Sequence, residues 1–253
     1  MGRIISIASQ KGGVGKTTTA INLGACLAQE SRRVLLVDMD PQGNMSSGVG
    51  VTGDDQRNTS YEVLLGEASP REAILPTALA SMDLMPTGQR LSGAEVELVA
   101  ISERESRLKS ALAAVRDDYD YILVDSPPSL GLLTVNSLNA SDSVIIPLQC
   151  EYLALEGLTQ IMKAITLIQA HLNPSLRIEG VLLTMYDGRV GLSKGVAEEA
   201  RKLFSNRVYK TMIPRNVRLS EAPSFGKPIV LYDPHCAGAE SYRELAREVL
   251  GHV

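Results

Sequence analysis

The sequence predicts an α/β fold in which a doubly wound, mostly parallel sheet carries helices on both faces. Short apolar runs alternate with helical patterns along the 253 residues, which is typical of βαβ units. The first apolar run ends in a glycine-rich loop that leads directly into a helical pattern. Leu, Ile, Val and Ala supply most of the apolar residues and Trp is missing, as expected for a parallel sheet covered by helices.

Hydrophobic periodicity gives the expected elements in chain order. The stretch 16–29 predicts a helix because Ala20, Leu23 and Leu27 recur at helical spacing. The polar, glycine-rich stretch 39–53 predicts a loop. Short apolar runs predict strands at 4–8, 34–37, 82–85, 121–124, 144–146 and 178–183. Further helices are expected at 155–171, 191–204 and 239–250, with weaker helical signals at 60–65 and 102–115.

No repeat, low-complexity tract or convincing linker interrupts this pattern, so we expect a single domain over 1–253. Cys26, Cys150 and Cys236 are far apart and form no CxxC pair, which argues against a disulfide framework or a zinc site. Met1 leads straight into a strand, so no signal peptide is expected. No apolar run approaches the roughly 20 residues of a membrane span. We therefore expect a cytoplasmic protein with no membrane partner.

Charge is distributed unevenly along the chain. The formal net charge is −4. The stretch 184–227 alone has nine basic and four acidic residues, a net charge of +5, which leaves −9 for the rest. A basic C-terminal third is compatible with nucleic-acid binding, even though the average is acidic.

A phosphate-binding loop is predicted between the first strand and the first helix. Glycines let a loop curl so that backbone N–H groups and a helix N-terminus point at one anion. The usual pattern is GxxxxGK[ST], but Gln10 occupies its first glycine position, and the sequence fits the variant KGGxGK[ST]. We expect Lys16 to reach the β- and γ-phosphates of ATP, Thr17 to bind Mg²⁺ and Thr18 to contact the α-phosphate. The whole predicted loop is Lys11, Gly12, Gly13, Val14, Gly15, Lys16, Thr17 and Thr18.

Lys11 precedes the curl, so its side chain is not expected to fold back onto the phosphates of its own chain. With this second lysine the loop resembles that of the deviant Walker A ATPases, a family that includes ParA, Soj and MinD. The resemblance implies that Lys11 crosses a dimer interface to the partner's phosphates. ATP would then be sandwiched in an ATP-dependent homodimer.

Three carboxylates follow predicted strands at the edge where parallel sheets bind ligands. Asp38 and Asp40 follow the second strand, and Asp125 ends the run 121–124 in a Walker B pattern, delivering a carboxylate to the Mg²⁺ shell. A helix N-cap is the alternative role for Asp125. The resemblance assigns Asp40 to positioning the attacking water, with Asp38 supporting the metal. The predicted catalytic residues are thus Lys11, Lys16 and Asp40. The sequence shows no arginine finger, so we expect slow hydrolysis without a stimulating partner.

Two later stretches, 147–157 and 213–224, most closely resemble the ParA/Soj branch of that family. The resemblance spans essentially the whole chain and is to a chromosomal Soj that starts at its ATPase domain, with no N-terminal helix-turn-helix extension. It places Pro214 and Asn216 near the adenine, with Met185 close by. It also implies a nucleoid-associated protein and a ParB (Spo0J-type) partner that stimulates hydrolysis.

The family binds double-stranded DNA without sequence preference as the ATP dimer. Arg189 and Arg218 match positions that carry this contact, and neutralising DNA phosphates releases counterions. A solvated basic face is the alternative interpretation of these cations. The additional candidates for DNA contact are Lys194, Arg201, Lys202 and Lys227.

Three competing functions were weighed. A MinD-like membrane-cycling ATPase needs a basic amphipathic C-terminal helix, but the polar face of 239–250 mixes both signs. Electron transfer like that of the nitrogenase iron protein needs paired cysteines, and only Cys150 lies in a suggestive stretch. A ligase or amidotransferase needs a further nucleophile or pocket, and His171, His235 and His252 have no such context. A DNA-partitioning ATPase is the favoured prediction.

Overall fold

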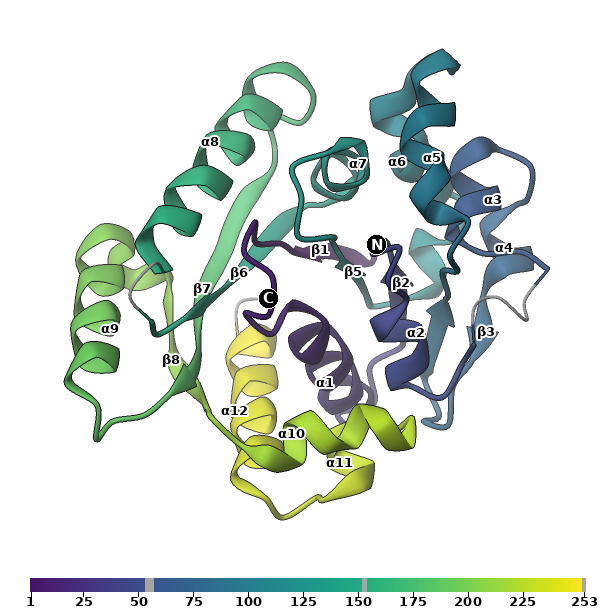
Figure 1. Ribbon diagram of the computed structural model, residues 1–253. Helices are drawn as coiled ribbons and strands as arrows, with labels where there is room; N and C mark the ends of the chain where they lie inside the picture. The colour runs from purple at the N-terminus through teal and green to yellow at the C-terminus, as the bar shows by residue number, and fades with distance from the viewer. Residues whose placement is uncertain (53–56, 152–153, 252–253) are drawn as a thin grey trace.

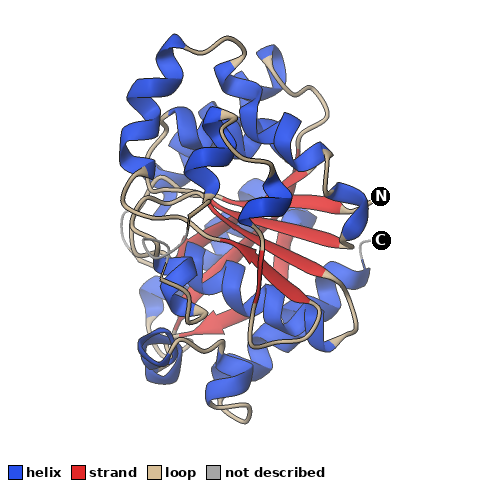
Figure 2. Ribbon diagram, turned by 90° about the vertical axis from the view of Figure 1, so that its right-hand side faces the viewer, coloured by secondary structure: helices blue, strands red, loops and turns tan. Residues whose placement is uncertain are grey.

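An eight-stranded sheet runs through the molecule in the order β3-β4-β2-β5-β1-β6-β7-β8 (Figures 1 and 2). Every neighbouring pair is parallel except β3 and β4. The structure is a computed structural model and describes residues 1–52, 57–151 and 154–251. The strands are β1 (Arg3–Ile7), β2 (Val34–Asp38), β3 (Leu75–Pro76), β4 (Met82–Met85), β5 (Tyr121–Asp125), β6 (Ser143–Gln149), β7 (Arg177–Tyr186) and β8 (Val208–Pro214).

Helices cover both faces of the sheet, which confirms the predicted doubly wound class (Figure 1). The helices of the N-terminal half are α1 (Lys16–Gln29), α2 (Asn44–Gly48), α3 (Ser60–Leu65), α4 (Pro70–Ala73), α5 (Leu91–Glu97), α6 (Arg107–Ala113) and α7 (Leu132–Ala140). Those of the C-terminal half are α8 (Ala154–His171), α9 (Gly191–Phe204), α10 (Val217–Glu221), α11 (Ile229–Tyr232) and α12 (Ala237–Gly251).

The alternation of side chains along each strand divides the core between the two faces. Ile5 and Ile7 of β1 pack with α1 and α12 on one face. Ile4 of β1 and its neighbours on β2 and β5 pack with α3, α5, α6 and α7 on the other face. The same second face continues over β6 and β7 beneath α8 and α9. Because both faces are covered, β2 and β5 are buried at every position and read as continuous apolar runs.

The strand order reverses at β1, whose neighbours are β5 on one side and β6 on the other. In open α/β sheets the ligand crevice lies at such a switch point, outside the carboxyl ends of the strands. The loop that leaves β1 at this edge is the predicted phosphate loop, and it enters α1 (Figure 1). The fold therefore brings this loop to the crevice together with the ends of β2, β5 and β7.

Several predicted elements needed correction. The loop expected over 39–53 contains the short helix α2. The helix expected over 102–115 is a 3₁₀ turn, Arg104–Ser106, followed by α6. Strand β8 and helices α5 and α7 were missed. The buried face of α7 carries Thr134, Asn136, Ser137 and Asn139 beside apolar residues, so it shows no apolar period.

Candidate functional site

The loop between β1 and α1 curls through two glycines. Gly13 and Gly15 have φ angles of 74° and 91°, in the left-handed region that glycine adopts without strain. Gly15 is also the N-cap of the 14-residue helix α1 and has no side chain to cap its first turn. The first N–H groups of α1 therefore face the crevice without a side-chain acceptor, and this arrangement attracts an anion.

A cleft of about 780 Å³ opens in front of this helix end. Its walls come from segments far apart in the sequence: the phosphate loop, the loop after β2, the end of β7, and the segment from β8 to α10. The predicted site residues that line it are Gly12, Gly13, Gly15, Lys16, Thr17, Thr18, Asp40, Met185, Pro214 and Asn216. Val14 is buried instead, and its carbonyl accepts a hydrogen bond of 2.8 Å from the Thr184 hydroxyl.

Thr184 and Gln42 also line the cleft and were missed by the sequence analysis. Thr184 ties the phosphate loop to β7, a contact between residues 170 positions apart. Gln42 follows Asp40 in the Asp-Pro-Gln-Gly-Asn motif, a signal that could have identified it. Met185, next to Thr184, has a φ of 51°, and such an uncommon backbone conformation is often found at functional sites.

Lys16 is a buried cation with weak partners. Its side chain lies in the cleft wall, and its Nζ donates a long hydrogen bond of 3.4 Å to the carbonyl of Lys11. Burial lowers the pKa of Lys16, while Asp125 and Asp40 raise it. A desolvated ammonium at the head of a helix is suited to bind an anion that brings its own charge into the cleft.

Asp125 and Asp38 lie side by side at the ends of the adjacent strands β5 and β2. Among the described residues, none donates a hydrogen bond of ordinary geometry to either carboxylate oxygen of Asp125, although both oxygens are buried. Burial, and next the neighbouring Asp38 carboxylate, raise the pKa of Asp125, while the Thr17 hydroxyl and the Lys16 ammonium lower it. Asp125 is not among the described residues that line the cleft, but it has lone pairs available for a cation beside Thr17 and Lys16.

The oxygens of Asp38 are already engaged by the protein. They accept hydrogen bonds from the amide and hydroxyl of Ser46, at 2.9 and 2.7 Å, and from the amide of Asp40, at 3.2 Å. Burial raises the pKa of Asp38 to about 6, while these bonds oppose the shift. The predicted metal role of Asp38 stays a prediction, and the geometry favours Asp125 over Asp38 as the available oxygen donor.

These donors fit Mg²⁺ bound together with phosphates. Mg²⁺ takes oxygen ligands and is usually held by one or two carboxylates plus substrate phosphates. The part of the chain that the structure describes has no group of three or more His, Cys, Asp or Glu that could hold a metal alone. Asp125 offers a carboxylate beside the Thr17 hydroxyl and the amino-terminal end of α1, which attracts anions. This arrangement suits a Mg²⁺ ion that is also bound by phosphates.

Lys11 lies outside the set of described residues that line the cleft. Its ammonium is 3.8 Å from Glu151, a carboxylate that also lies 3.5 Å from the guanidinium of Arg215. The Lys11 side chain is 35% exposed and therefore accessible from outside the chain. The contact of Lys11 with a second subunit therefore stays a prediction.

The six cations predicted to contact DNA are all exposed, but several have acidic partners. Arg189 pairs with Asp187 at 2.7 Å, and Lys202 pairs with Glu199 at 2.6 Å. Arg218 lies 2.8 Å from Glu221 and 3.4 Å from Asp233, beside the cleft. Lys194 and Arg201 lie on α9, and Lys227 lines the cleft. The positive field of this face is therefore weaker than the number of bases suggests.

The C-terminal helix α12 packs into the core. Tyr242, Leu245, Ala246 and Val249 are buried against α1 and the sheet. The Tyr242 hydroxyl lies 3.2 Å from the Thr19 hydroxyl of α1. None of the described helices is long and apolar enough to span a membrane.

The parallel sheet, the curled loop before α1 and the second lysine define a P-loop nucleotide-binding protein of the deviant Walker A class. The family model described as "AAA domain" matches residues 2–178. The chain is 59% identical to the sporulation initiation inhibitor protein Soj of Bacillus subtilis, with 98% of each chain covered. It is 56% identical to the chromosome partitioning protein ParA of Myxococcus xanthus, covering 99% of this chain and 88% of that one.

Among solved structures, the fold matches a protein of Mycobacterium smegmatis named cobyrinic acid a,c-diamide synthase, with an ATP analog and magnesium bound. The TM-score is 0.88 at 39% identity, over 100% of this chain and 96% of that chain. The protein studied belongs to the ParA/Soj family of deviant Walker A P-loop ATPases.

Proposed function

We propose that this protein is a DNA-segregation ATPase whose ATP-bound dimer binds DNA and is released from it by hydrolysis. The observation that carries the proposal is the full-length similarity to Soj and ParA proteins, several of which are named for chromosome partitioning. The cleft supports it, because Gly12, Gly13, Gly15, Lys16, Thr17 and Thr18 of the motif line its wall. The 253 residues would act as one domain.

ATP is the proposed ligand of the cleft, with Mg²⁺. Its phosphates would lie at the head of α1 on the backbone of residues 12–15, neutralised by Lys16 and contacted by Thr18. Thr17 and Asp125 would hold the cation, which supplies charge neutralisation of the phosphates when bound. Met185, Pro214 and Asn216, which also line the cleft, would contact the adenine. The magnesium–ATP-analog complex of the M. smegmatis protein, at 39% identity, supports this assignment.

Hydrolysis would depend on positioning and charge stabilisation, because phosphoryl transfer needs little covalent help from protein. Asp40 lines the cleft and would orient the attacking water. Lys16 would stabilise the charge that develops on the phosphates. Lys11, held by Glu151 in the single chain, would complete the site of a partner subunit. An isolated chain lacks that second cation, so hydrolysis would be slow until a ParB-type partner stimulates the dimer.

DNA binding would use the exposed face around Arg189 and Arg218, with Lys194, Arg201, Lys202 and Lys227. Acidic partners reduce the attraction of a single subunit for phosphates. A dimer presents this face twice, so two weak contacts combine into useful affinity. ATP-dependent dimerisation would then make DNA binding ATP-dependent and concentrate the protein on the nucleoid.

The decisive test is co-sedimentation with double-stranded DNA at fixed salt in ATP, ADP or no nucleotide. We expect binding with ATP alone, and loss of that binding in Arg218→Glu, with ATP affinity unchanged. Arg33→Glu is the matched control. Arg33 is also exposed and paired with an acid, but it directly precedes β2, at the amino-terminal ends of the strands. DNA binding that does not depend on the nucleotide, or that is unchanged in Arg218→Glu, would contradict the proposal.

A MinD-like membrane-cycling ATPase is the alternative. Its anchor would have to be α12, but the apolar face of that helix is buried in the core. The polar face carries Glu240, Arg243, Glu244, Arg247 and Glu248, so its net charge is not basic. Nucleotide-dependent sedimentation with anionic liposomes, in the absence of DNA, would favour this alternative over DNA segregation.

An amide-forming enzyme is a second alternative, raised by the name of the M. smegmatis protein. A glutamine-dependent reaction needs a nucleophile near the activated substrate, most often a cysteine. The described residues that line the cleft include neither cysteine nor histidine. Complete conversion of ATP to ADP and phosphate in the absence of any amide acceptor would support the ATPase.

A further inference from the structure

Ser46 sits at the centre of a buried hydrogen-bond chain behind the cleft. Its amide and its hydroxyl both donate to the same carboxylate oxygen of Asp38, at 2.9 and 2.7 Å. The Ser46 hydroxyl oxygen in turn accepts a bond of 3.1 Å from the amide of Thr87. Ser46 and Thr87 are each 1% exposed and Asp38 is fully buried, so water cannot replace these bonds.

The chain continues from Asp38 to the loop that carries Asp40. The second oxygen of Asp38 accepts the amide of Asp40 at 3.2 Å. The carboxylate and carbonyl of Asp40 then accept the amides of Gln42 and Gly43, at 3.1 and 2.9 Å. The backbone position of Asp40 therefore depends on where the Asp38 carboxylate is held, and Ser46 holds it.

We propose that Ser46 is a positioning residue for ATP hydrolysis, which fixes Asp38 and thereby the Asp40 loop against the segment that follows β4. The inference rests on the proposed function, because it takes Asp40 as the residue that orients the attacking water. A hydroxyl suits this place since it donates and accepts at once. Alanine can do neither, whereas threonine keeps both capacities.

The position of Ser46 separates this role from nucleotide binding. Among the described residues that line the cleft, Asp40, Gln42, Asn44, Ser47 and Gly48 come from the same segment, but Ser46 is absent. Losing its hydroxyl removes no contact with a ligand in the cleft and loosens the loop that carries Asp40. Displacing a catalytic group by about 1 Å can reduce a rate about 100-fold. The expected signature is a lower kcat at unchanged ATP affinity.

The test compares Ser46→Ala and Ser46→Thr with wild type by single-turnover phosphate release and by equilibrium binding of a fluorescent ATP analogue. We expect Ser46→Ala to lower the rate about 10- to 100-fold, with ATP affinity within threefold, and Ser46→Thr to keep most of the rate. Ser137→Ala is the control. Ser137 is as buried as Ser46, and its hydroxyl donates only to the carbonyl of Leu133 within its own helix.

Equal losses of rate and ATP affinity in Ser46→Ala would show a merely structural role, and an unchanged rate would overturn the inference outright. Hydrogen exchange of the Thr87 and Asp40 amides gives a readout that needs no turnover. Both should exchange at least tenfold faster in Ser46→Ala and as in wild type in Ser46→Thr. Unchanged protection in Ser46→Ala would reject the inference. A wild type that shows this protection but never hydrolyses ATP would instead defeat the proposed function, and the catalytic role of Ser46 with it.

Discussion

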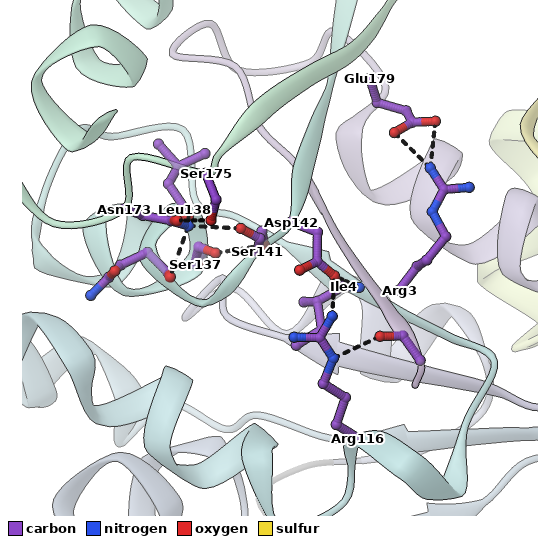
Figure 3. A network of polar contacts seen from close by, with 12 residues as sticks. Arg3, Ile4, Arg116, Ser137, Leu138, Ser141, Asp142, Asn173, Ser175 and Glu179 are labelled. Carbon is purple, nitrogen blue, oxygen red and sulfur yellow. Dashed lines mark hydrogen bonds and ion pairs between the residues drawn. The ribbon is translucent and has the colours of Figure 1, made fainter. Parts of the chain in front are cut away.

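At the amino-terminal ends of β1, β6 and β7 the charged side chains form ion pairs, whereas on the carboxyl-terminal side of the sheet neither Asp125 nor Lys16 has such a partner among the described residues. Figure 3 shows the first region. Arg3 donates twice to Glu179 at 2.8 Å, and Arg116 lies 2.6 Å from Asp142, which also accepts the amide of Ile4. The side-chain amide of Asn173 donates to three carbonyl oxygens at the end of α7.

The opposite ends of the same sheet contain groups that are buried more deeply and lack such partners among the described residues. Asp125 accepts no hydrogen bond of ordinary geometry from the described residues, and Lys16 makes one long bond. Burying a charge is costly unless it is paired. The amino-terminal network therefore stabilises the fold, while the carboxyl-terminal edge keeps an unfavourable arrangement that a ligand can relieve. Three predictions test this difference, from the largest expected effect to the smallest.

Removing the cation of the cleft should affect the ligand and not the fold. We expect Lys16→Ala to weaken ATP binding about 100- to 1,000-fold, because the phosphates lose a desolvated charge partner. The melting temperature without nucleotide should not fall, since the cost of burying the Lys16 ammonium exceeds its attraction to Asp125 and Asp40. Titration calorimetry and thermal melting measure the two effects. Lys109→Ala, at an exposed lysine on α6, is the control. Wild-type ATP affinity in Lys16→Ala would remove the phosphate role from this loop.

Neutralising Asp125 should lower activity without lowering stability. We expect Asp125→Asn to raise the Mg²⁺ concentration needed for hydrolysis up to about 100-fold. The free energy of unfolding without ligand should rise by about 1 kcal/mol, because a neutral amide is less costly to bury than a charge. Urea unfolding and a Mg²⁺ titration of phosphate release are the measurements. A clear loss of stability would mean that Asp125 has a hydrogen-bond or ion-pair partner in solution. The proposed difference between the amino-terminal and carboxyl-terminal ends of the strands would then be wrong.

Breaking the network at the amino-terminal ends of the strands should lower stability and leave ATP binding unchanged. We expect Asp142→Ala to lower the free energy of unfolding by about 2 kcal/mol, because Arg116 and the amide of Ile4 lose a charged acceptor. ATP affinity should stay within twofold. Asp117→Ala, one residue beyond Arg116 and exposed, should change stability by less than about 0.5 kcal/mol. If Asp142→Ala changed ATP binding and left stability intact, the amino-terminal ends of the strands could not be assigned to stability and the carboxyl-terminal ends to ligand binding.

The parts of the fold that depend on local pattern could be predicted from the sequence. The bounds of α1 and α9 agree with the prediction: α1 is buried at every position from Thr19 to Ala28, and α9 buries a stripe that includes Val196, Ala197 and Ala200. Strand β8 was missed since it is the sheet edge and alternates buried with exposed residues, among them Lys210. Helix α7 was missed because polar residues on its buried side make hydrogen bonds to the backbone of neighbouring segments, as Asn136 does to Arg104.

For the candidate site, the sequence by itself determined the phosphate loop, since glycines, two lysines and a helix start are consecutive and act through the local backbone. It also placed Asp38, Asp40 and Asp125 at one edge of the sheet. Only the tertiary structure decided which carboxylate is engaged and which is open. Ser46 donates to Asp38 and accepts the amide of Thr87, whereas the described residues place no donor of ordinary geometry at Asp125. Ser46 and Thr87 are 41 positions apart, and Asp38 and Asp125 lie side by side only when the sheet has formed, so no local pattern could reveal the difference.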